Sequence, residues 1–169
     1  MCITYFNSYL WSMDSWQSLL GLSQKLLLEM KNMAKAGGFE YFLVPVRPYG
    51  KANYPLHSLA EYTCWLREDG LSLDPWLRTH VKNDGEILLP MEHCHMLSGS
   101  IDEWAKSTNL TFQSSGQFIV PRALSPLFVD LETGLGTLTE GNVWVSYPLI
   151  KPLIYYTNEV CSQTDSFVR

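Results

Sequence analysis

The stretch Ser18–Pro48, "SLLGLSQKLLLEMKNMAKAGGFEYFLVPVRP", decides how the first part of this chain is expected to fold. Its apolar residues recur at the spacing that makes one stripe along a helix, at Leu22, Leu26, Leu27, Met30, Met33 and Ala34. We expect this helix to begin at the small residues of the Gly21–Ser23 turn and to end at Gly37-Gly38. The apolar and aromatic run Phe39–Val46 then predicts a buried strand.

The segments around this stretch extend the pattern. Residues 1–11, "MCITYFNSYLW", are rich in the aromatic residues and strand formers typical of a strand. Strand, helix and strand in this order predict a βαβ unit with parallel strands and a right-handed crossover. Further helices are predicted after Pro55, after Asp74 as N-cap, and after the Ser100–Glu103 capping box. Five further strands are predicted at residues 85–90, 93–99, 116–121, 126–132 and 142–148. The fold class is therefore α/β, of the mixed α+β kind.

The composition restricts the kinds of partner. The chain has 169 residues, 46% of them hydrophobic, which fits one globular domain. Its net charge of −5 argues against nucleic acid as a partner, because a phosphate backbone requires a basic surface. The sequence has no run of eighteen apolar residues, so no membrane-spanning helix is expected, and no secretory signal is evident. The four cysteines lack CxxC spacing and are expected to be reduced, which favours a cytoplasmic location.

The Gly21–Ser23 turn has two interpretations. The first backbone N–H groups of a helix lack partners within the helix and carry partial positive charge, so small residues there let a phosphate approach. On the local pattern alone, simple capping of the helix is favoured over a phosphate site. Residues 1–60 carry five Lys/Arg and three Asp/Glu, a net of +2, whereas residues 61–169 carry seven and fourteen, a net of −7. An anionic ligand is therefore better suited to the first third of the chain.

Several strings together resemble the GNAT superfamily of N-acyltransferases. They are the segment beginning at Gly21 and, after it, "PVRPYGKANYPL", "DGLSLDPWLRTHV", "SGSIDEWAKSTNLTFQSSGQFIVP" and "EGNVWV". The similarity covers about residues 15–147. The resemblance implies a GNAT-like mixed sheet with flanking helices over residues 1–147 and a tail over 148–169. It also implies that the N-terminal strands and helices of the family are missing from this chain.

The same resemblance implies a set of site residues. Backbone amides at the helix start would hold the pyrophosphate of acetyl-CoA, at Gly21, Leu22, Ser23 and Gln24. Arg47 would contact phosphate or carbonyl groups of the cofactor with its fork of donors. Tyr54, seven residues later, would protonate the departing thiolate. The alternatives are a structural pairing of Arg47 with a carboxylate and a half-buried, structural Tyr54.

The function implied is that of an acyl-CoA-dependent acyltransferase, in particular an N-acetyltransferase. An amine of a small-molecule acceptor would attack the thioester directly, with acetyl-CoA or another acyl-CoA as co-substrate and without a metal. The alternative is a non-catalytic GNAT-like remnant or binding module. That alternative predicts exposed apolar surface and self-association, and a homo-oligomer is left open.

The string "MEHCHML" suggests a third hypothesis. On a regular strand His93 and His95 face the same way, which suits a metal, but no third ligand is identifiable. Surface or packing roles are therefore favoured over a metal site. Either histidine, His80 or Glu140 would serve as a base toward an amine acceptor, and the sequence does not rank them.

Overall fold

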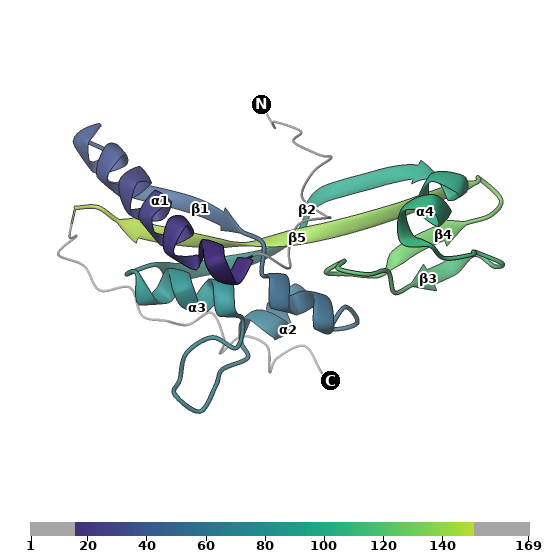
Figure 1. The fold of residues 1–169 in the computed structure, drawn as a ribbon, viewed down its shortest axis with the longest axis horizontal. Coiled ribbons are helices and arrows are strands. Elements are labelled where there is room, and N and C mark those ends of the chain that lie inside the picture. The colour runs from purple at the N-terminus through teal and green to yellow at the C-terminus, as the bar shows by residue number, and fades with distance from the viewer. Residues whose placement is uncertain (1–15, 151–169) are drawn as a thin grey trace, which may run out of the picture.

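The computed structural model describes residues 16–150, which form one antiparallel sheet with helices at both of its ends (Figure 1). The helices are α1 (Trp16–Ala36), the 3₁₀ helix η2 (Tyr49–Asn53), α2 (Leu59–Thr63), α3 (Pro75–Lys82) and α4 (Ile101–Thr108). The strands are β1 (Tyr41–Val46), β2 (Glu86–Ser100), β3 (Gly116–Phe118), β4 (Leu127–Asp130) and β5 (Leu135–Pro148). The predicted mixed α+β class is confirmed.

Strand β5 is the central strand of the sheet. Strand β2 pairs with one side of it over most of its length, from Glu86 opposite Ser146 to Ser100 opposite Leu135. On the other side, β1 pairs with residues 143–148 and β4 with residues 135–138. Within the described sheet, residues 139–142 of β5 therefore have no strand on that second side. Figure 1 shows β5 and β2 spanning the molecule, with α1, α2 and α3 toward one end and α4, β3 and β4 at the other.

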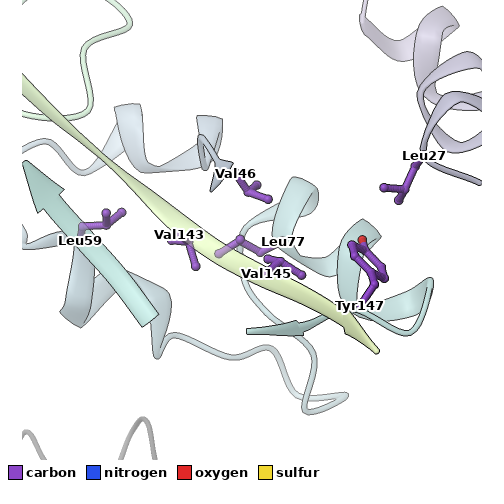
Figure 2. Packing of buried hydrophobic residues seen from close by; sticks show 7 residues of the cluster. All are labelled: Leu27, Val46, Leu59, Leu77, Val143, Val145 and Tyr147. Atoms are coloured by element: carbon purple, nitrogen blue, oxygen red, sulfur yellow. The ribbon is translucent and has the colours of Figure 1, made fainter. Parts of the chain in front are cut away.

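The two ends of the sheet have separate apolar cores. The first is built from Leu27, Val46, Leu59, Leu77, Val143, Val145 and Tyr147. Alternate residues of a strand face the same side, so three residues of β5 enter this core together, as Figure 2 shows. The second is built from Phe112, Val120, Ala123, Leu127, Val129 and Leu138. The stretch of β5 between the two cores is where polar side chains gather.

The predicted first helix is confirmed, but its predicted start is wrong. Helix α1 begins at Trp16, so the Gly21–Ser23 segment lies inside the helix and not in a turn before it. A single glycine costs a helix interior only about 1 kcal/mol relative to alanine, too little to stop a helix whose neighbours favour it. The predicted end is confirmed, because Gly38 takes a positive φ of 78° directly after the last turn.

The prediction for residues 39–46 is confirmed as to strand and corrected as to burial. Strand β1 lies at the edge of the described sheet, and Tyr41 and Leu43 are about half exposed. Every pairing among the described strands is antiparallel, so the expected parallel pairing is not seen in residues 16–150. The strand predicted at residues 1–11, which would complete the βαβ unit, lies outside the described residues.

The predicted caps are confirmed. The Asp74 carboxylate accepts hydrogen bonds from the backbone N–H groups of Trp76 and Leu77, at 2.8 and 3.0 Å. The hydroxyl of Ser100 and the carboxylate of Glu103 form the reciprocal capping box of α4. The strands predicted at 85–90 and 93–99 are joined into the single strand β2.

Candidate active site

An ion pair crosses the gap beside the middle of β5. Arg47 directly follows β1, and its Nε and Nη2 atoms lie 2.9 and 3.0 Å from the two carboxylate oxygens of Glu140. Nη2 also donates to the backbone carbonyl of Arg122 at 2.9 Å, and the backbone N–H of Leu124 donates to Glu140 at 2.7 Å. These bonds tie β1, β5 and the loop before β4 together. The structure therefore shows the structural pairing of Arg47, while its contact with a cofactor stays a prediction.

Lys51 is only 2% exposed, and it is linked to this ion pair through Leu124, whose backbone bonds both Lys51 and Glu140. Its Nζ atom donates to the backbone carbonyls of Tyr54 and Leu124, at 2.9 and 2.6 Å. Burial lowers the pKa of Lys51, and the carboxylates of Glu92, Glu140 and Glu61 partly oppose that shift. The 3₁₀ helix η2 thus places a buried lysine at the site.

A buried carboxylate holds that 3₁₀ helix in position. Asp74 is fully buried, and besides capping α3 it accepts hydrogen bonds from the Gly50 backbone N–H at 2.9 Å and the Tyr62 hydroxyl at 3.2 Å. Burial raises the pKa of Asp74, and its hydrogen bonds oppose the shift. A Cβ at Gly50 would lie 2.6 Å from the Tyr62 hydroxyl oxygen, so glycine is required for this close approach.

A bulge in β2 forms the facing wall. Met91 pairs with Asn142 and His95 with Glu140, so four steps along β2 match only two along β5. A regular strand would send neighbouring side chains to opposite faces, yet Glu92 and His93 line the same hollow. Gly141 of β5 permits this approach, because a Cβ there would lie 2.3 Å from the Met91 carbonyl oxygen.

These elements surround a small open hollow of about 90 Å³. It is lined by Lys51, His57, Leu59, Glu92, His93, Leu124, Ser125, Thr139 and Gly141. The Glu92 carboxylate accepts hydrogen bonds from the backbone N–H groups of Leu59 at 3.1 Å and Ala60 at 2.9 Å. The volume suits a few waters or one small polar group, and it is far too small for a nucleotide cofactor.

Tyr54 lies beside the hollow. Its ring packs edge-on against Trp65 with the ring centroids 5.0 Å apart, and lies 6.4 Å from the ring of His57, which lines the hollow. The His57 Nδ1 atom lies 2.9 Å from the carboxylate of Glu61. Tyr54 is 40% exposed, so a ligand can reach it as well as solvent. Its role as an acid stays a prediction.

The predicted pyrophosphate cradle, Gly21, Leu22, Ser23 and Gln24, occupies the sixth to ninth positions of α1. Backbone amides at such positions donate to carbonyls four residues earlier in the helix. They are therefore not the unpaired donors of a helix start, and a cradle here would need other contacts. Leu27, one turn later, packs in the same core cluster as Val46 at the end of β1. The helix thus lies against the strand from which Arg47 extends. The cradle itself stays a prediction.

The structure places the four candidate bases in different surroundings; they are His80, His93, His95 and Glu140. His80 is buried, its Nδ1 atom lies 2.6 Å from the Tyr147 hydroxyl, and burial lowers its pKa to about 4. His95 contacts the Asn142 amide at 3.0 Å, and His93 lines the hollow. Residues 16–150 contain no group of three His, Cys, Asp or Glu side chains placed to hold a metal. The register shift between Met91 and His95 falls on the segment that contains His93.

Lys51 and Glu92 were not identified from the sequence. A bulge leaves no periodic signal, and the pairing of Met91 with Asn142, which brings Glu92 close to Gly141, joins residues about fifty positions apart. The one available sign was the glycine itself, because a glycine inside a strand often marks a bulge or a close backbone approach. For Lys51, the neighbouring Gly50 was a similar sign.

Comparison with known proteins yields one informative relative. No family model matches this chain. No solved structure matches it either. The chain is 28% identical, over 147 aligned residues, to the arginine N-acetyltransferase avaD of Aspergillus versicolor. The match covers 76% of this chain and 51% of that relative, so the chain spans about half the relative's length. None of the helices in residues 16–150 is long and apolar enough to cross a membrane.

Proposed function

We propose that this chain is an N-acetyltransferase that moves the acetyl group of acetyl-CoA to an amine of a small acceptor. The observation that carries the proposal is the similarity to an arginine N-acetyltransferase across three quarters of the chain. The GNAT-like strings of the sequence and the mixed α+β fold support the same proposal. The acceptor proposed is an amino-acid-sized amine, the class to which arginine belongs.

The chemistry requires few groups. The neutral amine attacks the thioester carbonyl, the C–N bond forms, and the C–S bond then breaks to release coenzyme A as a thiolate. The amine nitrogen loses one proton and the thiolate gains one. Tyr54 is the proposed donor of that proton, because it is an exposed phenol whose ring lies 6.4 Å from that of His57, which lines the hollow. Most of the rate enhancement would come from holding amine and thioester together.

The remaining donors of Arg47 are the proposed contact for the cofactor. The pair with Glu140 and the bond to Arg122 use its Nε and Nη2 atoms. A third of the Arg47 side chain stays exposed. Nη1 is therefore the atom proposed to donate to a phosphate or carbonyl oxygen of acetyl-CoA, and residues 21–24 stay the predicted neighbours of its pyrophosphate.

The experiment is an assay of free-thiol release with acetyl-CoA and arginine, combined with mass spectrometry of the acceptor. The proposal expects thiol release that depends on both substrates, and a product heavier than arginine by one acetyl group. Thiol release without an acetylated acceptor would be hydrolysis and would contradict the proposed transfer. No release with arginine or any of a panel of primary amines would contradict the enzyme assignment.

One observation favours the alternative of a binding module. Large apolar side chains of α1 and β1 are exposed, at Leu26, Leu28, Met33, Tyr41 and Leu43. Such a surface is typical of an interface with protein. Light scattering after gel filtration tests it: a binding module that self-associates through this surface would be oligomeric and would lack acetyl transfer.

A further inference from the structure

We infer that the hollow beside the β2 bulge binds a cationic group of the acceptor, with the carboxylate of Glu92 as its anchor. That the bound molecule is the acceptor of acetyl transfer rests on the proposed function, whereas the binding of a cation by Glu92 does not. The inference goes beyond that function because it assigns a subsite and restricts the acceptors to those that carry a second nitrogen group.

Two charged groups line the hollow, the Glu92 carboxylate and the Lys51 ammonium, and two further carboxylates, of Glu61 and Glu140, lie near enough to oppose the effect of burial on the pKa of Lys51. Glu140 is paired with Arg47, and Glu61 lies beside His57. Within the part of the chain that the structure describes, Glu92 has no Lys, Arg or His nitrogen at ion-pair distance.

Lys51 interacts with Glu92 through charge but is not within ion-pair distance of it. Two of the three hydrogens on its ammonium are directed to the backbone carbonyls of Tyr54 and Leu124. Burial also lowers the pKa of Lys51, and the charge of Glu92 is the largest effect that opposes this shift. A half-buried carboxylate without a close counter-ion is costly, and a bound cation removes that cost.

The geometry fixes the carboxylate in place for a ligand. The backbone N–H groups of Leu59 and Ala60 each donate to one oxygen of Glu92. An ionised carboxylate has about four acceptor positions, so about two are left for a ligand. The bulge places His93 beside Glu92, and His57 lines the same hollow, so a flat or compact cation meets polar groups on several sides.

The reaction chemistry then restricts the acceptor. The amine that attacks the thioester must be neutral, whereas the group held by Glu92 is positively charged. The two are therefore different nitrogens of one molecule. Acceptors with a single amine lack the anchored group, whereas basic amino acids and diamines have it. The hollow of about 90 Å³ accommodates a guanidinium or ammonium end but not a whole amino acid with a long side chain.

The test compares L-arginine with L-citrulline, in which a neutral urea of nearly the same shape replaces the guanidinium. Binding of each to the full chain is measured by calorimetry, and KM is measured where transfer occurs. We expect arginine to be favoured about tenfold or more in wild type, and Glu92→Gln to reduce that ratio to about one. Glu86→Gln on the same strand is the matched control, because Glu86 is exposed and does not line the hollow; it should keep the ratio.

Each outcome decides the inference. Equal binding of arginine and citrulline to wild type overturns it, as does no binding of either, or a preserved ratio in folded Glu92→Gln. Should Glu92→Gln fail to fold because it loses bonds to α2, the wild-type ratio alone decides. Preferential arginine binding without acetyl transfer would support the cation site while contradicting the proposed enzyme. Acetyl transfer without preferential binding of arginine would support the proposed enzyme while contradicting the cation site.

Discussion

The Arg47–Glu140 pair provides a prediction whose size follows from the structure. Glu140→Gln keeps the shape of the side chain and removes its charge, leaving Arg47 without its counter-ion. Exposed ion pairs contribute about 0–1 kcal/mol, and breaking a fully buried pair costs about 3–5 kcal/mol. The Glu140 side chain is 11% exposed and that of Arg47 is 33% exposed, so the pair lies between these limits. We expect the free energy of unfolding to fall by about 2 kcal/mol.

The measurement is urea unfolding followed by tryptophan fluorescence and by circular dichroism. A loss of about 2 kcal/mol corresponds to a decrease in melting temperature of roughly 4–8 °C for a domain of this size. The control is Glu132→Gln, because Glu132 is exposed in the β4–β5 turn and its backbone N–H, not its carboxylate, makes the local bond to Asp130. It should change the free energy of unfolding by less than about 0.5 kcal/mol.

A double-mutant cycle isolates the pair from the other bonds of Glu140. Arg47→Met alone removes the cation and its bond to the Arg122 carbonyl, while the Leu124 N–H can still donate to the carboxylate. The two changes together should destabilise by less than the sum of the single changes, with a coupling of about 1 kcal/mol or more. Additive losses, or a Glu140→Gln variant as stable as Glu132→Gln, would refute a structural role for the pair.

Three further predictions concern the close approach, the acid and the buried histidine. Gly141→Ala places a Cβ against the Met91 carbonyl and should cost about 3 kcal/mol in urea unfolding, whereas Gly99→Ala on β2 meets only side-chain ends and should cost far less. Tyr54→Phe should lower kcat about a hundredfold with little change in stability, while Tyr49→Phe, also exposed, leaves kcat unchanged; equal rates for both would exclude Tyr54 as the acid. Because burial depresses the pKa of His80 to about 4, the unfolded chain binds that proton more readily, and stability should be lost as pH falls from about 6.5 toward 4; His80→Gln should flatten that slope.

Local signals explain which parts of the fold were predictable. The caps at Asp74 and Ser100 were found because a cap and its partners lie within four residues of each other. The body of α1 was found from its apolar period, but its start was not, because one glycine does not end a helix. The central place of β5 depends on its pairings with β1 and β2, which join residues 35 (Ser100 and Leu135) to 107 (Tyr41 and Pro148) positions apart and which no local pattern encodes.

The site was predictable only in part for the same reason. Arg47 and Tyr54 were identified by resemblance, and the structure places both near the middle of β5, Arg47 on Glu140 and Tyr54 beside the hollow. The position of Glu92 at the hollow follows from the bulge in β2 and could not be predicted from the sequence, because a regular strand would place Glu92 and His93 on opposite faces. The burial of Lys51 likewise follows from a loop about seventy residues further along the chain.

The most direct test of the central claim is a calorimetric titration of acetyl-CoA into the purified chain, repeated with Arg47→Met. The proposed N-acetyltransferase predicts saturable binding with one site per chain, weakened at least severalfold by Arg47→Met after correction for any unfolded fraction. Absence of heat and of a thermal shift at millimolar acetyl-CoA would contradict it.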